Sequence, residues 1–258
     1  MPMYVMQEQS RRQEAIREVC TATAAKDNLT NHPINLKHFT YLPQYNLLYC
    51  RIPKTGTTSW LSGTIIRLAE QLGMEFGNRE ALVEHFKVKD MEMWKHIMKN
   101  NPISFANVRH PFERLVSGYL DSVVNWSTKN TDKYKEQGTF KDFITNTVLR
   151  EADEMELTNR PSKMFPDWRP YHDRCNFCQV RYKVISKTET FDEDKNRILK
   201  MIGVDEERRV ERMHVHAGDK IHDITKKHFE TIPKEVKEKL IKVYQYEFAM
   251  FNYDPEMY

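Results

Sequence analysis

The chain has 258 residues, with 40 lysines and arginines against 37 aspartates and glutamates, and a formal net charge of +3. This length suits one large α/β domain or two small ones with a sizeable core. Because both charge signs are abundant, charge alone does not argue for nucleic acid as a partner. No apolar run is long enough to span a bilayer, and the first residues lack the apolar core of a signal peptide.

The predicted elements alternate between helix and strand along the chain. Residues 1–27 predict a polar amphipathic helix, and residues 28–44 predict a loop. Strands are predicted at Asn46–Ile52, Ile103–Val108 and Val180–Ser186. Helices are predicted at Thr57–Leu72, within 78–100, from Pro111, at Phe140–Leu149, from Thr190 to near Gly203, and from Pro233 to Phe248. Strands that alternate with helices favour a parallel sheet with helices on both faces.

In other segments the hydrophobic residues show no regular spacing. Residues 125–138 predict a polar loop and residues 151–178 an irregular segment. Thr190 and Glu193 have the spacing of a capping box. We expect a helical and loop extension over 1–44, followed by a single domain over 45–258.

A short loop follows the first predicted strand in YCRIPKTGTTSW, Tyr49 to Trp60. A strand, a tight loop of small residues and a helix make a phosphate cradle, because the loop N–H groups and the helix N-terminus point at an anion. Lys54 adds a mobile charge. The nucleotide pattern G-x-x-x-x-G-K-[ST] is absent, so no Mg²⁺ ligand is evident. The loop predicts an anion site without an obligatory metal; a turn with a solvated lysine is the plainer alternative.

The stretch FANVRHPFERLVSGYL, Phe105 to Leu120, repeats the strand-to-helix pattern. Pro111 opens the helix, where its missing N–H costs nothing. Ser117 lies about 120° from the centre of the apolar face, at the roughly 100° per residue of an α-helix. Arg109 at the strand end and Ser117 can therefore grip one phosphate together. A surface arginine and a solvent-facing serine are the plainer alternative.

Together the two stretches resemble the donor-binding segments of sulfotransferases. RIPKTGTTSW resembles their 5′-phosphosulfate loop, and NVRHPFERLVSGY resembles their 3′-phosphate segment. Downstream, DWRPYHDRCNFCQVRYKVISKTETFDEDKNRIL and VYQYEFAMFNYDP resemble Golgi carbohydrate sulfotransferases of the chondroitin and dermatan type. That group often has Val-Gly-Cys where this chain has Thr55-Gly56-Thr57. The resemblance implies a P-loop-like three-layer α/β fold, with a central, mainly parallel sheet flanked by helices.

The resemblance implies transfer of a sulfuryl group from 3′-phosphoadenosine 5′-phosphosulfate to a sugar hydroxyl, with no metal required. Lys54 would neutralise the charge that develops on the bridging oxygen of the donor. Arg109 and Ser117 would fix the 3′-phosphate. The residues expected to bind the donor are Arg51, Pro53, Lys54, Thr55, Gly56, Thr57, Thr58, Ser59, Arg109, Ser117 and Lys187.

The implied acceptor is a carbohydrate of a glycosaminoglycan or a glycoprotein, and an acidic glycan requires positive charge around the site. The cations available on the expected acceptor side are Lys87, Lys89, Arg169 and Arg174, for which solvated surface charge is the plainer interpretation. The hydroxyl also needs a base. We predict His85 as this catalytic base, and the alternatives are His110, Glu113 and His172.

The four cysteines Cys20, Cys50, Cys175 and Cys178 permit three pairings if all form disulfides. His172-x-x-Cys175-x-x-Cys178 also has the spacing of metal ligands, with His214 or His216 as a distant fourth. We expect structural disulfides, in line with the resemblance to luminal enzymes, and the pairing stays open.

The resemblance implies a type II membrane protein of the Golgi lumen whose anchor is not in this chain; contact with a membrane would come only through that anchor. The sequons Asn28-Leu29-Thr30 and Asn125-Trp126-Ser127 lean toward a secretory compartment. Two other functions stay open: a donor-binding protein without transfer activity, and an atypical P-loop nucleotide kinase.

Overall fold

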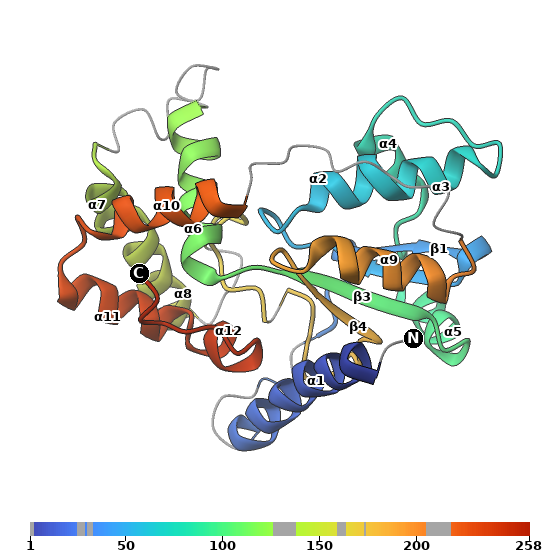
Figure 1. Cartoon of the computed structure of the whole chain (residues 1–258), viewed down its shortest axis with the longest axis horizontal. Helices are drawn as coiled ribbons and strands as arrows, with labels where there is room; N and C mark the ends of the chain where they lie inside the picture. Colours follow the sequence, from blue (N-terminus) through green and yellow to red (C-terminus); the bar gives the residue numbers. More distant parts are fainter. Residues whose placement is uncertain are drawn as a thin grey trace. The chain divides into compact units, whose positions relative to one another are not determined.

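The computed structural model describes residues 3–24, 29, 33–125, 138–158, 164–172, 174–204 and 218–258 (Figure 1). The chain forms two compact units: Met1–Val108 with Arg174–Val215, and Arg109–Asp173 with His216–Tyr258. The predicted loop over 126–137, the distant His214 and His216, and part of both sequons lie outside the described residues. The division into an extension over 1–44 and a domain over 45–258 stays a prediction.

The first unit is built on a four-stranded sheet of order β1-β2-β3-β4. Its strands are β1 (Phe39–Leu42), β2 (Leu47–Cys50), β3 (Ile103–Val108) and β4 (Val184–Lys187). β1 pairs antiparallel with β2, whereas β2, β3 and β4 run parallel. The predicted α/β fold with a central, mainly parallel sheet is therefore confirmed.

Strand bounds differ from the predictions where the side chains give little periodic signal. β3 was predicted with its observed bounds, but β2 is shorter than 46–52 and β4 starts later than 180. β1 was missed because residues 28–44 were predicted to be a loop. The strand has only four residues and lies between Pro33 and Pro43, so it resembled a turn-rich connection.

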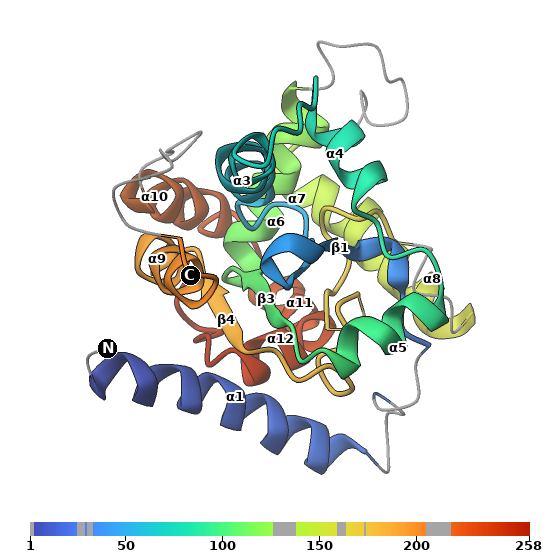
Figure 2. The same cartoon turned by 90° about the vertical axis from the view of Figure 1, so that its right-hand side faces the viewer.

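Helices flank this sheet, as predicted. The helix α2 (Thr57–Trp60) continues through a π-helical turn (Leu61–Ile65) into α3 (Ile66–Glu70). Trp60 of this helix and Phe191 of α9 (Phe191–Met201) pack on the face that carries Tyr49 and Phe105. In Figure 2, α3 and α9 lie on one side of β3 and β4, and α1 (Met3–Thr23) lies on the other.

A further helix packs on the opposite face of the sheet, against β1. Trp94 of α5 (Met91–Lys99) packs edge-on against Phe39 of β1, with ring centroids 4.7 Å apart. The predicted helix within 78–100 is two helices, α4 (Arg79–His85) and α5, because Asn78 and Asp90 each cap a helix N-terminus through the side chain.

The predicted capping box of α9 is wrong. Thr190 is the N-cap residue, but its side chain makes no cap hydrogen bond. Its hydroxyl donates instead to the carboxylate of Asp194, at 2.6 Å. The competing carboxylate inside the first turn of the helix therefore takes the hydroxyl.

The described part of the second unit contains helices, turns and no strand. Its helices are α6 (Pro111–Tyr119), α7 (Phe140–Phe143), α8 (Arg150–Thr158), α10 (Gly218–Phe229), α11 (Lys234–Val243) and α12 (Gln245–Met250), with π-helical turns at Leu120–Asn125 and Ile144–Leu149. The prediction of an irregular segment from residue 151 is wrong for α8, and α10 was not predicted. The last helix is divided near Tyr244 rather than continuous to Phe248.

Buried aromatic rings form the core of the second unit. Phe112 of α6 stacks on Phe229 of α10, with ring centroids 4.3 Å apart, and also meets Phe248 of α12. Phe143 of α7 packs edge-on against Trp168. No helix in the described part of the chain has the length and apolarity needed to cross a membrane.

Two disulfides connect distant parts of the first unit. Cys20 of α1 pairs with Cys178, and Cys50 at the end of β2 pairs with Cys175. The expectation of structural disulfides is confirmed, and the alternative metal site loses both sulfur ligands to these bonds. The pairs close loops of 158 and 125 residues in sequence separation.

A double Cys20→Ser, Cys178→Ser variant should lower the free energy of unfolding by about 2–5 kcal/mol, because a long loop then opens in the unfolded chain. Urea unfolding followed by circular dichroism measures the change, with Cys50–Cys175 left intact in both proteins. An unchanged midpoint and slope would contradict this stabilising role.

Candidate active site

The predicted phosphate loop lies between β2 and α2 and has a strained backbone. Lys54 and Gly56 both adopt left-handed conformations, with φ of 66° and 86°. Such a conformation is uncommon for a residue with a side chain and is found most often at ligand sites. Turns that include left-handed residues direct successive N–H groups toward one anion. Gly56 is also the N-cap residue of α2.

Buried side chains hold the loop from the inside. The hydroxyl of Thr55 donates to the carbonyl of Ile52 at 2.8 Å, and the hydroxyl of Thr57 donates to the same carbonyl. The amide of Asn107, from β3, donates to the carbonyl of Thr55. Thr55 is fully buried, so its hydroxyl serves the loop. Asn107 was missed by sequence reasoning, although an asparagine in the apolar run ISFANV was a visible signal.

Burial shifts the pKa values of two groups beside the loop, Arg51 and Tyr49. Burial lowers the pKa of the Arg51 guanidinium, which donates to the carbonyl of Lys37. Burial raises the pKa of the Tyr49 hydroxyl to about 12, and this hydroxyl lies 3.5 Å from that of Thr57. Thr58 accepts from Arg79 at 2.9 Å. Lys54 and Ser59 are half-buried.

Lys187 lies at the carboxyl end of β4. It is in register with Val108, the last residue of β3, and the next residue, Thr188, donates its N–H to the Val108 carbonyl at 3.0 Å. Burial lowers the pKa of the Lys187 ammonium, while the carboxylate of Glu189 raises it and the charge of Arg12 lowers it.

In the second unit, Arg109 lies two residues before α6, and Ser117 lies in its last turn. The Arg109 side chain is paired with Glu113 through Nε, at 3.2 Å, and both side chains are largely buried. The other oxygen of Glu113 accepts from the Tyr258 hydroxyl at 2.6 Å. The backbone carbonyl of Arg109 accepts from the Tyr171 hydroxyl at 2.9 Å. Ser117 is half-buried, which agrees with its predicted place beside the apolar face.

Two histidines of the second unit have structural partners. His110 caps α6: its Nδ1 accepts from the N–H of Phe112, so Nε2 donates to the carbonyl of Asp254. Burial lowers the pKa of His110, which keeps this buried ring neutral. His172 pairs through Nδ1 with the buried carboxylate of Glu247, at 2.8 Å. Burial acts to raise the pKa of Glu247, but His172 and the backbone N–H donors lower it below its ordinary value.

A basic groove of about 780 Å³ lies in the first unit. The charged and titratable residues that line it are Lys37, Glu84, His85, Lys87 and Lys89. Three predicted acceptor-side residues, His85, Lys87 and Lys89, are therefore brought together. Lys37 was missed, because residues 28–44 were treated as a loop outside the domain. Arg169 and Arg174 are not among the lining residues; Arg174 donates to the carbonyl of Arg51 instead.

The groove is attached to the sheet beside the phosphate loop. Residues 86–88 run antiparallel to β1, since Tyr41 donates to the carbonyl of Phe86 and Lys87 bridges Thr40. β1 is itself antiparallel to β2, so residues 86–88 run parallel to β2 and reach Lys89 at the edge where the loop begins. At the same edge Arg51 donates its N–H to the carbonyl of His38, at 2.9 Å.

Within the described residues, no cluster of three or more histidine, cysteine, aspartate or glutamate side chains has an arrangement that holds a metal ion. The sheet, the glycine-containing loop after β2 and the loop lysine define an α/β protein with a candidate anion-binding loop.

Comparison with known proteins gives the family. The model of the sulfotransferase family matches residues 37–254, which is most of the chain. The chain therefore belongs to the sulfotransferase family, and the enzyme class predicted from the two motifs is confirmed. No solved structure matches the chain significantly.

Similar proteins of known name are carbohydrate sulfotransferases. Carbohydrate sulfotransferase 11 of Rattus norvegicus is 27% identical over 276 residues, which cover 96% of this chain and 76% of the relative. Carbohydrate sulfotransferase 10 of Homo sapiens is 26% identical over 272 residues, which cover 94% of this chain and 74% of the relative. These names agree with the group that the motifs resemble.

Gly56→Ala should lower the free energy of unfolding more than Gly73→Ala. Both glycines have positive φ, of 86° and 75°, and so share a backbone cost of about 1–2 kcal/mol. A Cβ at Gly56 would lie 3.3 Å from the Phe191 ring and 3.4 Å from Asn107, whereas Gly73 has no atom within 4 Å. Urea unfolding of both variants separates the packing cost from the backbone cost. Equal losses in the free energy of unfolding would show that the loop adjusts to the added Cβ without a packing cost.

Proposed function

We propose that this sulfotransferase uses 3′-phosphoadenosine 5′-phosphosulfate as donor and a carbohydrate hydroxyl as acceptor. The observation that carries the proposal is the loop after β2, where Lys54 and Gly56 are left-handed and buried hydrogen bonds fix the backbone. Such a rigid loop binds an anion through N–H groups at little cost in reorganisation. The names of the relatives support a carbohydrate acceptor.

The loop would bind the 5′-phosphosulfate end of the donor. Backbone N–H groups from Lys54 to Ser59 and the half-buried hydroxyls of Thr58 and Ser59 are the donors for the 5′-phosphate. The hydroxyls of Thr55 and Thr57 are engaged with Ile52, which leaves their N–H groups as the binding atoms. Arg51 and Pro53 shape the loop, and Arg51 adds a half-buried guanidinium beside it.

Arg109 and Ser117 would bind the 3′-phosphate of the donor. The Nε pairing with Glu113 fixes the guanidinium plane, and the hydroxyl of Tyr171 fixes the backbone of the same residue. Orientation by these partners gives Arg109 the preorganised fork that phosphate recognition needs. Lys187 supplies a further positive charge at the carboxyl end of β4.

Transfer would proceed by in-line displacement at sulfur. The acceptor oxygen forms a bond to sulfur while the bond from sulfur to the leaving 5′-phosphate oxygen breaks, and the acceptor proton passes to a base. Lys54 neutralises the negative charge that grows on that leaving oxygen, where a preorganised cation stabilises the transition state most.

The basic groove is the proposed acceptor site. Lys37 and Lys89 give it the positive charge that an acidic glycan requires, whereas Lys87 is paired with Glu84 of the same groove. The attachment of the groove at the loop end of the sheet supports access to the donor sulfur. We accordingly propose an acidic glycan, such as a chondroitin-type glycosaminoglycan, as acceptor, and the Golgi lumen as location.

His85 is the proposed base. It is exposed on the last turn of α4, lines the groove and contacts the rings of Phe76 and Phe86. The alternatives are engaged elsewhere: His110 caps a helix and Glu113 accepts from Arg109 and Tyr258. His172, oriented by Glu247, is the next residue to test.

Lys54→Ala should reduce turnover on the order of 10²–10³-fold, because it removes the charge that faces the leaving oxygen. The measurement is transfer of radiolabelled sulfate to native and desulfated glycosaminoglycans in EDTA, with Lys99→Ala as a surface control. Wild-type protein should bind adenosine 3′,5′-bisphosphate and stay active in chelator. Near-normal turnover of the variant would contradict the role of Lys54. If the wild-type protein were active only with Mg²⁺ and ATP, the kinase alternative would be favoured instead.

A Lys37→Glu, Lys89→Glu variant should raise the KM for an acidic acceptor on the order of tenfold, because both side chains line the groove. The affinity for adenosine 3′,5′-bisphosphate should not change. Lys95→Glu, Lys99→Glu on α5 is the charge-matched control outside the groove. If both variants raised KM equally, net charge rather than the groove would be responsible.

A further inference from the structure

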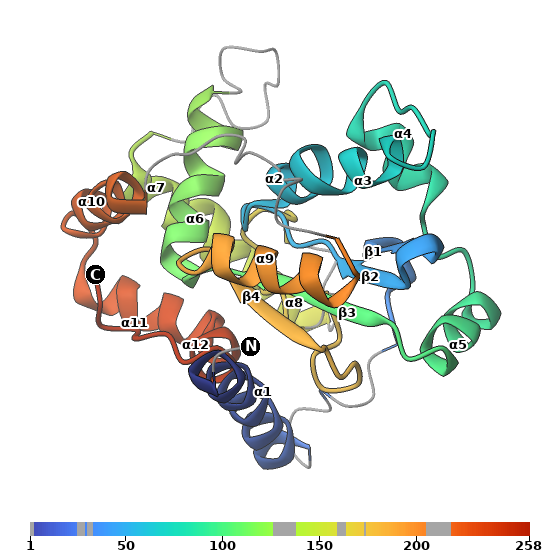
Figure 3. The same cartoon turned by 45° about the vertical axis from the view of Figure 1, so that its right-hand side comes forward.

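Polar side chains of α1 bind the backbone of β4 and of the two residues just before it, along the outer edge of the sheet. Gln9 Nε2 donates to the carbonyl of Ile185 at 3.0 Å, and Gln9 Oε1 accepts from the N–H of Ile185 at 2.9 Å. Gln13 donates to the carbonyls of Tyr182 and Lys183. The side-chain amides thus take the place of a neighbouring strand and cover an exposed sheet edge. Figures 1 and 3 show α1 running alongside β4.

Arg12 binds the edge of β4 and also the residues Thr190 and Asp194 beyond the strand. Its Nη1 donates to the carbonyl of Ile185 and to Asp194 Oδ2, both at 2.8 Å, and its Nη2 donates to the Thr190 hydroxyl at 3.0 Å. The side chains of Arg12 and Asp194 are each only 5% exposed. Burial alone would lower the pKa of Arg12, but the carboxylates of Asp194 and Glu8 raise it, so the ion pair stays charged.

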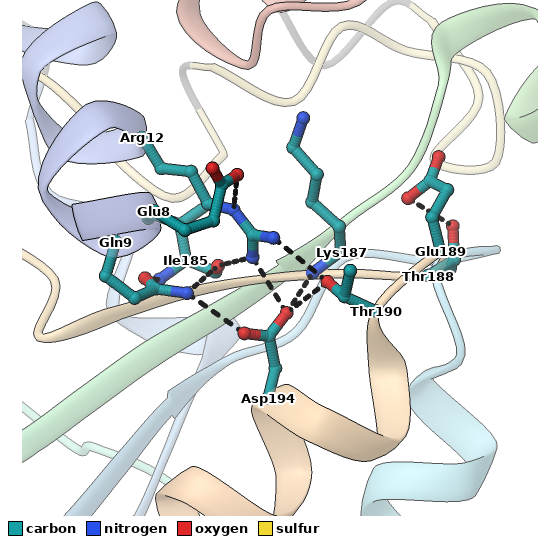
Figure 4. Close-up of polar contacts among 9 residues, drawn as sticks. All are labelled: Glu8, Gln9, Arg12, Ile185, Lys187, Thr188, Glu189, Thr190 and Asp194. Carbon is teal, nitrogen blue, oxygen red and sulfur yellow. Dashed lines mark hydrogen bonds and ion pairs between the residues drawn. The ribbon is translucent and has the colours of Figure 1, made fainter. Parts of the chain in front are cut away.

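Asp194 connects this pair to the turn that follows β4. The same Oδ2 accepts from the backbone N–H of Lys187 at 3.1 Å and from the Thr190 hydroxyl at 2.6 Å, and Oδ1 accepts from Gln9 at 3.0 Å. One buried carboxylate therefore fixes both ends of the turn 187–190 to α1. In Figure 4 the side chain of Lys187 extends away from this carboxylate while its backbone is held by it.

We propose that Arg12 is a positioning residue for donor binding, which acts through Asp194 to hold Lys187 in place. The inference rests on the proposed function, in which Lys187 contributes charge to the donor site. A buried ion pair is weak as a source of net stability, but it fixes geometry strongly because each partner must be satisfied. Gln9 already binds both backbone groups of Ile185, and Gln13 binds the two residues before β4 without touching the turn, so edge protection alone does not require Arg12.

The test compares the affinity of the nucleotide for Arg12 variants in two proteins, one with Lys187 and one with alanine at position 187. Arg12→Lys keeps the charge, but one ammonium cannot reach Ile185, Asp194 and Thr190 with the fixed fork of a guanidinium. Its Kd for adenosine 3′,5′-bisphosphate is measured by titration calorimetry with and without Lys187→Ala, alongside urea unfolding. Gln13→Ala is the matched control on the same helix. Arg12→Ala is avoided as the main variant, because it would leave Asp194 buried and unpaired.

Arg12→Lys should weaken binding about 3- to 30-fold when Lys187 is present, and should add almost nothing once Lys187 is alanine. Gln13→Ala should lower the unfolding midpoint and leave the Kd unchanged. An equal loss in both backgrounds, or no loss at all, would overturn the positioning role while leaving the donor assignment intact. If Lys187→Ala alone left the Kd unchanged, the donor role of Lys187 would fail together with this inference. If the wild-type chain did not bind the nucleotide, the proposed function itself would fail.

Discussion

Parallel pairing of β2, β3 and β4 is the constraint on which the rest of the first unit depends. Cys50 lies in register with Ala106, and Val108 with Lys187, so the carboxyl ends of the three strands meet at one edge of the sheet. Everything that leaves those ends is collected at that edge: the loop before α2 and the turn before α9. Ligands of open α/β sheets bind at such an edge for this reason. The strand register therefore determines where the candidate site lies, and single residues determine only its chemistry.

The phosphate loop shows how the interior of the sheet supports that edge. Thr55 is fully buried and Asn107 lies on the central strand β3, yet the hydroxyl of Thr55 and the side-chain nitrogen of Asn107 both bond to the loop backbone. A left-handed lysine is costly, and it persists only where surrounding contacts determine the conformation. The same contacts keep N–H groups aimed before an anion arrives, which is the preorganisation that electrostatic catalysis requires.

The sequence predicted the elements whose hydrophobic residues repeat with the period of a helix or a strand. The apolar run of β3 and the apolar face from Phe112 onward were visible because the hydrophobic residues themselves pack. β1 and α10 carried weaker patterns and were missed. The buried stripe of α1 includes Gln9 and Arg12 beside Ala15 and Ile16, so half of its packing face looks like solvent-exposed helix. Cysteine count alone also leaves disulfide pairing undetermined.

Besides the amide contacts of Gln9 and Gln13, two anchors of different chemistry attach α1 to the rest of the first unit. Cys178 holds Cys20 covalently, and Asp194 holds Arg12 by charge and hydrogen bonds. The two anchors are eight residues apart in the chain, which is about 12 Å along a helix axis. One anchor would leave the helix free to pivot, whereas two fix its direction against β4. An oxidising compartment, where disulfides persist, therefore supports the geometry of the turn that carries Lys187 as well as the stability of the fold.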